Sequence, residues 1–87
     1  MVLRAAAACD SGEKAGAFAN APKYCAAEAA FLACETAIMA HSGMGYAREY
    51  HVERYFREIQ IARIAPVSPQ LILSYIAERV LELPKSY

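Results

Sequence analysis

The sequence predicts an all-α fold: an antiparallel helical bundle of three full helices and a shorter N-terminal stub. Two observations carry this prediction. Alternating β-branched runs and Asn-Gly hairpin turns, which mark strands, are absent from the 87 residues. Apolar residues instead recur every three or four positions, which is the spacing of one helix face. A chain of this length has room for one domain, so we assign residues 1–87 to a single unit.

The first predicted element is a helical stub from Val2 to about Cys9. Asp10-Ser11-Gly12 ends it, because these residue types favour turns. The stub has no start signal of its own, so we expect that its beginning has been cut off.

The second helix runs to Ala40 and has two candidate starts. Local rules place the start at Asn20 as the cap, with Pro22 in the first turn, where a missing N–H costs nothing. An earlier start near residues 11–13 would leave Pro22 to kink a longer helix.

This second helix carries two apolar seams. One repeats at spacings of three and four and consists of Tyr24, Ala27, Phe31, Cys34 and Ile38. The other is made only of alanine and consists of Ala26, Ala30, Ala33, Ala37 and Ala40. A helix with two apolar faces has to be covered on both sides. We therefore expect it to be the central helix, with the alanine face allowing another helix to approach closely.

The third and fourth helices have simpler patterns. The third spans about Arg48 to Ala62, and its predicted buried stripe consists of Val52, Tyr55, Phe56 and Ile59. The fourth opens with Ser68-Pro69, a cap followed by proline at the first helical position. Its predicted seam consists of Leu73, Ile76, Val80 and Leu83, and Pro84 marks its end.

Composition excludes several classes of protein. Nine Lys and Arg balance nine Asp and Glu, whereas a nucleic-acid binder of this size usually has a basic excess. No segment approaches the roughly 20 apolar residues of a membrane span. An apolar content of 57% with zero net charge predicts poor solubility as a monomer, and hence association with a partner.

The cysteines and histidines indicate neither a disulfide framework nor a metal site. Three cysteines without a paired motif favour a reducing compartment, so we expect a cytoplasmic protein, or one of the mitochondrial matrix if the source is eukaryotic. Cys25 and Cys34 are interpreted as small packed hydrophobes. His41 and His51 have no second ligand at metal spacing.

A glycine turn, His41-Ser42-Gly43-Met44-Gly45-Tyr46, joins the second and third helices. Its structural interpretation is a helix end, with Gly43 in the left-handed cap conformation and Gly45 allowing a sharp turn. Its functional interpretation is a close backbone approach to a phosphate or a ring. A glycine pair without a preceding strand is weak evidence for phosphate binding, so the local pattern favours the structural interpretation.

Taken in order, these segments resemble the C-terminal helical-bundle domain of flavin-dependent acyl-CoA dehydrogenases. The likeness rests on APKYCAAEAAF (residues 21–31), HSGMGY (41–46) and EYHVERYFR (49–57). It covers nearly the whole chain but only the C-terminal part of a family member. It implies part of a four-helix-bundle domain, FAD as cofactor and α,β-dehydrogenation of an acyl-CoA thioester.

The resemblance also implies residues that contact FAD. The glycine turn of the family approaches the FAD of a neighbouring subunit, which corresponds here to Gly43 and, where many members have glutamine, to Met39. The opening of the last helix meets the adenosine end, which corresponds to Ser68 and Gln70. Many members carry the catalytic glutamate just before that opening, but the matching positions here are Ala65-Pro66-Val67. We therefore name no catalytic residue.

Two hypotheses follow for function. The first is a C-terminal fragment of an acyl-CoA dehydrogenase, inactive alone, whose parent would bind an acyl-CoA and pass electrons to an electron-transfer flavoprotein. The second is a stand-alone helical interaction module without a redox role. Both predict self-association, since family members are usually tetramers built through this bundle.

Overall fold

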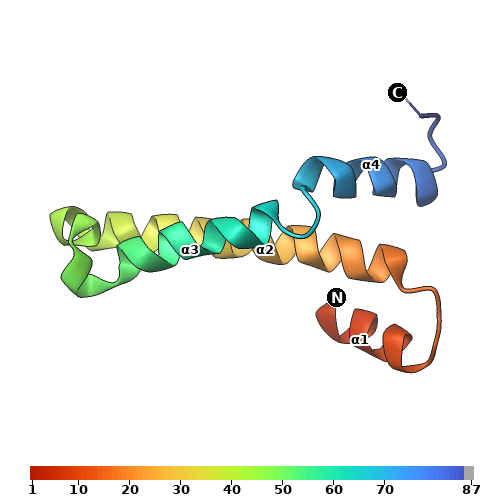
Figure 1. The fold of residues 1–87 in the computed structure, drawn as a ribbon, viewed down its shortest axis with the longest axis horizontal. Coiled ribbons are helices and arrows are strands. Elements are labelled where there is room, and N and C mark those ends of the chain that lie inside the picture. The colour runs from red at the N-terminus through yellow and green to blue at the C-terminus, as the bar shows by residue number, and fades with distance from the viewer. Residues whose placement is uncertain (86–87) are drawn as a thin grey trace.

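The computed structural model describes residues 1–85 and confirms the all-α fold (Figure 1). In that range there are two 3-10 turns, η1 (Ser42–Tyr46) and η2 (Arg48–Tyr50), and no strand. The α-helices are α1 (Val2–Asp10), α2 (Gly16–Ala40), α3 (Val52–Ile64) and α4 (Pro69–Arg79). They correspond to the predicted stub and the three predicted helices.

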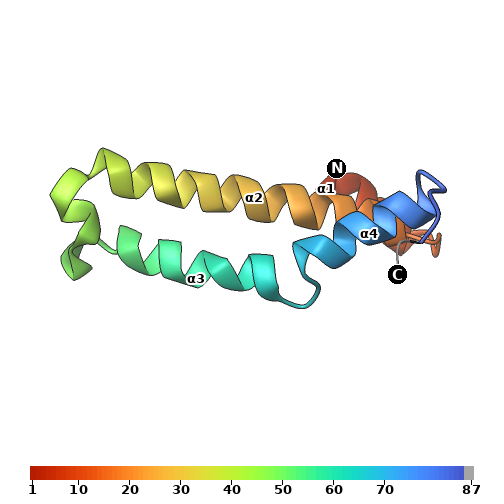
Figure 2. The ribbon, with the colours of Figure 1, turned by 90° about the horizontal axis from the view of Figure 1, so that it is seen from above.

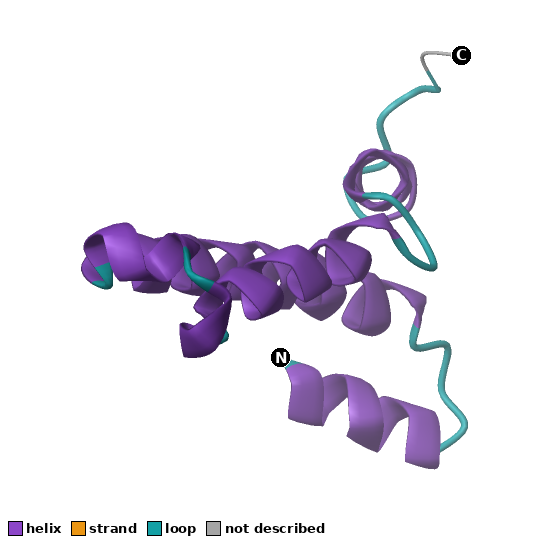
Figure 3. Cartoon of the chain, turned by 60° about the vertical axis from the view of Figure 1, so that its left-hand side comes forward, coloured by secondary structure: helices purple, strands orange, loops and turns teal. Residues whose placement is uncertain are grey.

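Helix α2 organises the molecule. It lies antiparallel to α3 along its C-terminal part, and η1 and η2 form the connection between them (Figures 1 and 2). Helices α1 and α4 both pack against the N-terminal part of α2, on different sides of it (Figures 1 and 3). Each of the other helices therefore contacts α2, as expected for the central helix.

The start of α2 differs from both candidate positions. The helix begins at Gly16, so Asn20 lies inside it and its amide nitrogen donates to the Gly16 carbonyl over 2.9 Å. Ala15 occupies the N-cap and no side chain caps the helix, which is why the cap rules missed it. Pro22 lies inside the helix and is buried. Because proline has no N–H, the Phe18 carbonyl lacks its usual helical donor.

Helix α3 begins later than predicted, at Val52 instead of Arg48. His51 takes a left-handed backbone conformation with φ of 59°, and a right-handed helix does not continue through such a residue. The chain before it forms η2 instead. The helix ends at Ile64, close to the expected end at Ala62.

Helix α4 begins as predicted and ends early. Ser68 is its N-cap and accepts a hydrogen bond from the Leu71 amide. The helix ends at Arg79, before Pro84, because Glu82 takes a left-handed conformation with φ of 55°.

Of the two seams on α2, the mixed apolar seam is covered. Its member Ala27 is buried and the other four are half-buried. The alanine seam is covered only in part: Ala30 and Ala37 are half-buried, whereas Ala26, Ala33 and Ala40 are exposed. Residues 1–85 thus leave one side of α2 accessible to other protein surface.

The predicted stripes on α3 and α4 were partly wrong. Tyr55 is 52% exposed, and exposure of about one half also applies to Leu73, Val80 and Leu83. Ile72 is instead the buried residue of α4, at 1% exposed. It shares a helix face with Tyr75, whose ring packs against Gly16 of α2. Periodicity identifies an apolar face, but only packing decides which face is covered.

The helices are arranged openly. The molecule measures 47 × 33 × 18 Å, and its radius of gyration of 16.4 Å exceeds the roughly 12 Å of a compact domain of this length. Its accessible surface of 6630 Å² exceeds the roughly 5,000 Å² of a compact monomer of this mass. In residues 1–85 the buried apolar side chains are those of Ala8, Pro22, Ala27 and Ile72. Most apolar side chains therefore remain available for further contacts.

Other features can be stated for residues 1–85. No helix there is long and apolar enough to cross a membrane. No group of three or more His, Cys, Asp and Glu side chains in that range is arranged to hold a metal ion. Cys34 is half-buried, in agreement with its interpretation as a packed hydrophobe, but Cys25 is exposed. That interpretation was wrong for Cys25, which lies on the outer side of α2.

Candidate functional site

The start of α4 forms one candidate site. The Ser68 side-chain oxygen accepts a hydrogen bond from the Leu71 amide over 3.4 Å, and Pro69 occupies the first turn. A groove of about 310 Å³ opens beside this helix start, and its walls are Gln60, Arg63, Ile64, Ser68, Pro69 and Gln70. The structure thus places Ser68 and Gln70, both predicted from the sequence, in the same groove.

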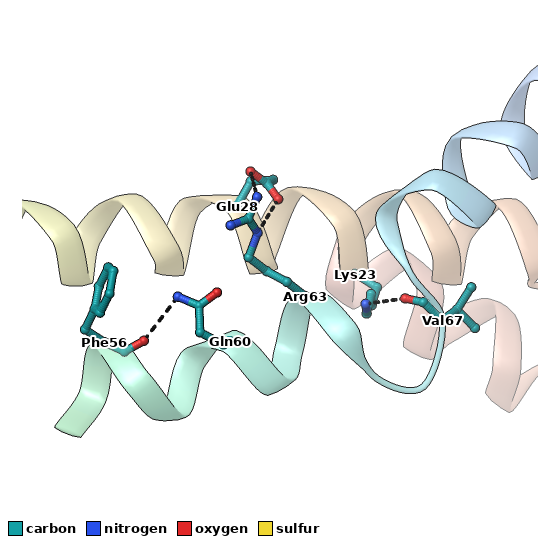
Figure 4. A network of polar contacts seen from close by, with 6 residues as sticks. All are labelled: Lys23, Glu28, Phe56, Gln60, Arg63 and Val67. Atoms are coloured by element: carbon teal, nitrogen blue, oxygen red, sulfur yellow. Dashed lines mark hydrogen bonds and ion pairs between the residues drawn. The ribbon is translucent and has the colours of Figure 1, made fainter. Parts of the chain in front are cut away.

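Arg63 and Gln60 are additional polar residues of this groove. The Arg63 guanidinium binds the Glu28 carboxylate of α2 through Nε over 2.9 Å (Figure 4). It also lies 4.4 Å from the centre of the Phe31 ring. Gln60 donates to the Phe56 carbonyl of its own helix over 3.3 Å. Neither residue is predictable from the sequence, because an arginine at a helix end and a single glutamine belong to no motif. Their proximity to Ser68 follows only from the turn after α3.

The glycine turn forms the second candidate site, and its glycines have other roles than predicted. Ser42, with φ of 53°, takes the left-handed conformation assigned to Gly43. At Gly43 a side-chain carbon would meet no atom within 4 Å, whereas at Gly45 it would collide with the Ile38 backbone. Gly45 is therefore the glycine that packs closely against the backbone of α2. Gly43 leaves its backbone open to an outside group.

Met39 lies near this turn with its side chain 75% exposed. His41 places its Nδ1 2.8 Å from the Ala37 carbonyl oxygen, and its ring lies 6.1 Å from the Tyr50 ring. These contacts pack one end of the turn against the chain that follows. Met39 and Gly43 are left as an exposed apolar surface next to exposed backbone.

The two candidate sites lie far apart within one chain. Met39 and Gly43 are at the C-terminal end of α2, coloured yellow-green in Figure 1, whereas Ser68 and Gln70 are at the start of α4. The α2–α3 hairpin separates them (Figure 2). A single copy therefore does not bring the four predicted contact residues together.

The comparison with protein families gives a specific result. A family described as "Acyl-CoA dehydrogenase, C-terminal domain" matches residues 1–81. The chain belongs to the acyl-CoA dehydrogenase family. The resemblance noted from the three sequence segments is thereby confirmed, and the all-α structure agrees with a helical domain of this family.

Curated proteins from several bacteria are similar over all or most of the chain. Acyl-CoA dehydrogenase FadE12 of Mycobacterium tuberculosis is 39% identical over 89 residues, covering 100% of this chain and 23% of that protein. A 3-(aryl)acrylate reductase of Clostridium sporogenes is 34% identical, and a cyclohexane-1-carbonyl-CoA dehydrogenase of Geobacter metallireducens is 33% identical. Each of these two matches covers 94% of this chain and 22% of the relative. The chain thus spans less than a quarter of the length of these relatives. No solved structure matches it significantly.

Residues 65–67, which the resemblance matches to the catalytic glutamate region of many family members, include no carboxylate. Pro66 lines a groove of about 430 Å³ between α2 and α3, whose other walls are Lys23, Ala26, Ala27, Ala30, Ile59, Ala62 and Ala65. The Glu28 carboxylate is bound by Arg63. Neither Pro66 nor its groove supplies a group that removes a proton from carbon.

The residues at the start of α4 fit one end of a flavin dinucleotide. Ser68 supplies a hydroxyl and Gln70 an amide side chain, which can bond the hydroxyl and phosphate groups of such a cofactor, whereas the Arg63 guanidinium of the groove is already bound to the Glu28 carboxylate. The groove is at the small end of ligand pockets, so it holds only part of the molecule. The turn at Gly43 offers open backbone, but Met39 supplies no polar atom there.

Proposed function

We propose that this chain is the flavin-contacting C-terminal bundle of an FAD-dependent acyl-CoA dehydrogenase that introduces an α,β double bond into an acyl-CoA thioester. The observation that carries this proposal is the family match over residues 1–81. The polar groove at the start of α4 supports it, because Ser68 and Gln70, the positions assigned to the adenosine end, share that groove. When bound, FAD accepts the hydride that leaves the β-carbon.

In this proposal the chain's residues bind and orient the cofactor. Ser68 and Gln70 contact the adenosine end of the cofactor. Gly43 allows the backbone of the turn to approach the flavin of a neighbouring copy, and Met39 adds an apolar contact. The proton on the α-carbon needs a carboxylate from outside residues 65–67, since Pro66 has none.

We further propose that the chain associates with copies of itself. The separation of the two candidate sites supports this, because one FAD can touch both sites only if they come from different copies. The exposed alanines of α2 and the large accessible surface support it as well. Acyl-CoA and an electron-transfer flavoprotein are then partners of the whole protein.

The experiment is size exclusion of the purified chain after incubation with FAD, with protein and flavin absorbance recorded together. We expect flavin to elute with an oligomer. Gln70→Ala should reduce the flavin that co-elutes, whereas Thr36→Ala should leave it unchanged, because Thr36 bonds only the Leu32 carbonyl on the exposed side of α2. Flavin that elutes separately from the wild-type chain would count against the flavin-contacting role.

A second measurement tests turnover. Incubation with acyl-CoAs of several lengths, FAD and a dye acceptor should give no dye reduction, because the chain holds no base at Pro66 and only part of a flavin site. Since a reductase is among the named relatives, enoyl-CoA with a reduced dye is included. Turnover in either direction would overturn the assignment of this chain as an inactive part.

The alternative function is a helical interaction module without a redox role. The open arrangement favours it, because exposed apolar faces on α2, α3 and α4 suit contacts with protein whether or not flavin is present. A stable oligomer that never retains flavin, and that is unaffected by Gln70→Ala, would support this alternative over the first.

A further inference from the structure

A lysine of α2 holds the chain just before α4. The Lys23 ammonium donates a hydrogen bond to the Val67 carbonyl over 2.7 Å, across 44 residues of sequence (Figure 4). Val67 directly precedes the cap residue Ser68, so its carbonyl lies outside the helix and has no partner in the hydrogen-bond ladder of α4. Lys23 therefore fixes the backbone at the entry to the groove.

This contact is not explained by stabilisation of the helix. The N-terminus of a helix carries a partial positive charge, so a cation beside it is unfavourable. Negative or neutral groups would serve the first turn of α4 better. Lys23 therefore fixes the position of the backbone, although its positive charge is unfavourable beside the N-terminus of α4.

A second contact ties the same segment to α2. The Arg63–Glu28 ion pair, with an Nε to Oε1 distance of 2.9 Å, lies at the end of α3. Figure 4 shows the two contacts on either side of the turn between α3 and α4. Together they attach both ends of that turn to α2, which leaves the turn little freedom to move relative to it.

We propose that Lys23 is a positioning residue for flavin binding, which acts by fixing Val67 and thereby the contact residues Ser68 and Gln70. This inference rests on the proposed function of the groove. Lys23 itself lines the neighbouring groove between α2 and α3, so it acts through the backbone of Val67.

The test compares three variants of the whole chain. Lys23→Met keeps most of the side-chain length and removes the donor, Lys23→Arg keeps a cationic donor, and Lys14→Met removes an exposed lysine from the α1–α2 connection. The first readout is amide hydrogen exchange at Leu71 and Ile72, whose amides bond Ser68. The second is the dissociation constant for FAD.

In Lys23→Met we expect exchange at Leu71 and Ile72 to accelerate about tenfold, the effect of losing one charge-assisted hydrogen bond. Exchange in the middle of α3 should not change, and FAD should bind about tenfold more weakly. In Lys23→Arg the exchange rates and the dissociation constant for FAD should both lie within about threefold of wild type, since arginine keeps a cationic donor. Lys14→Met should match wild type.

Different results would refute the flavin-contacting role of the chain and the positioning role of Lys23. Wild-type chain that binds no FAD refutes the flavin-contacting role, while the exchange rates still test whether Lys23 fixes the start of α4. Unchanged exchange at Leu71 and Ile72 in Lys23→Met refutes the positioning role. Exchange that accelerates equally throughout α2, α3 and α4 also refutes it, because Lys23 would then support the fold as a whole. If Lys23→Met does not fold, Lys23→Ala, which also lacks a donor and favours the helix, replaces it in the same comparison.

Discussion

The two glycines of the turn between α2 and α3 should respond in opposite ways to a single methyl group. A β-carbon at Gly45 would collide with the Ile38 carbonyl oxygen and lie 2.9 Å from its carbonyl carbon. These are backbone atoms, which cannot rotate away as the end of a side chain can. At Gly43 the same carbon meets nothing within 4 Å, and the backbone there is not left-handed.

The magnitudes follow from these surroundings. Replacing glycine by alanine restricts the unfolded chain and stabilises a protein by about 0.4–1 kcal/mol where the backbone allows it. Gly43→Ala should therefore raise the free energy of unfolding by that amount. Gly45→Ala gains the same term but adds an overpacking penalty of about 1–3 kcal/mol. The difference between the two variants isolates the collision, and we expect about 2 kcal/mol.

Urea denaturation followed by circular dichroism at the helix band gives both free energies. The two variants differ by two positions in the same turn, so composition and unfolded-state effects cancel. Equal free energies of unfolding for Gly43→Ala and Gly45→Ala would show that the close approach of Gly45 to Ile38 does not exist in solution. Gly43→Ala should also weaken FAD retention although it stabilises the chain, so the effect of this variant on cofactor binding is distinct from its effect on stability.

Further outcomes are expected elsewhere in the chain. Ile72→Ala should lower the free energy of unfolding by about 2–5 kcal/mol, because Ile72 is 1% exposed. Leu73→Ala, at a residue 49% exposed, should lower it by less than half as much. Similar losses for the two variants in urea melts would contradict the burial of Ile72 in place of Leu73. Ser68→Ala removes the side chain that accepts a hydrogen bond from the Leu71 amide, so it should lower the stability of α4 by about 1 kcal/mol. Amide hydrogen exchange at Leu71 should become faster, and an unchanged rate there would show that Ser68 does not cap the helix. Glu28→Gln should lower the free energy of unfolding by no more than about 1 kcal/mol, since the ion pair with Arg63 is partly exposed. This loss should become smaller in high salt. A loss that does not depend on salt would contradict an electrostatic origin.

Much of the fold was predictable because its determinants are local. The Ser68-Pro69 pair predicts a helix start from two adjacent residues, and the structure places α4 there. The mixed apolar seam of α2 repeats over several turns, so its covered face was predicted correctly. The start of α2 was missed for a local reason as well: Ala15 gives no cap, whereas Asn20 resembles one.

The rest depends on contacts between distant residues. Arg63 and Glu28 are separated by 35 positions, and no periodicity connects them, so the polar groove at the start of α4 was only half predicted. Leu73 and Tyr55 lie on apolar faces that the described chain leaves exposed. The sequence pattern marks these faces as apolar, but it does not say whether a face is covered or by which neighbour.

Pro22 divides α2 into two segments that can bend relative to each other. Gly16 and Lys23, through which α2 meets α4 and the turn before it, lie close to the proline, whereas the glycine turn is at the far end of the rod (Figure 1). The missing donor at Pro22 makes bending easiest at this point. Lys23 and Glu28, which hold the turn before Ser68, lie on the same side of Pro22 as Gly43. A change of a few degrees at Pro22 would therefore move Gly43 and this turn together, relative to the first turns of α2 at Gly16. A bend at Pro22 would thus leave both candidate sites of a copy in place relative to each other and would change the position of α1 relative to them.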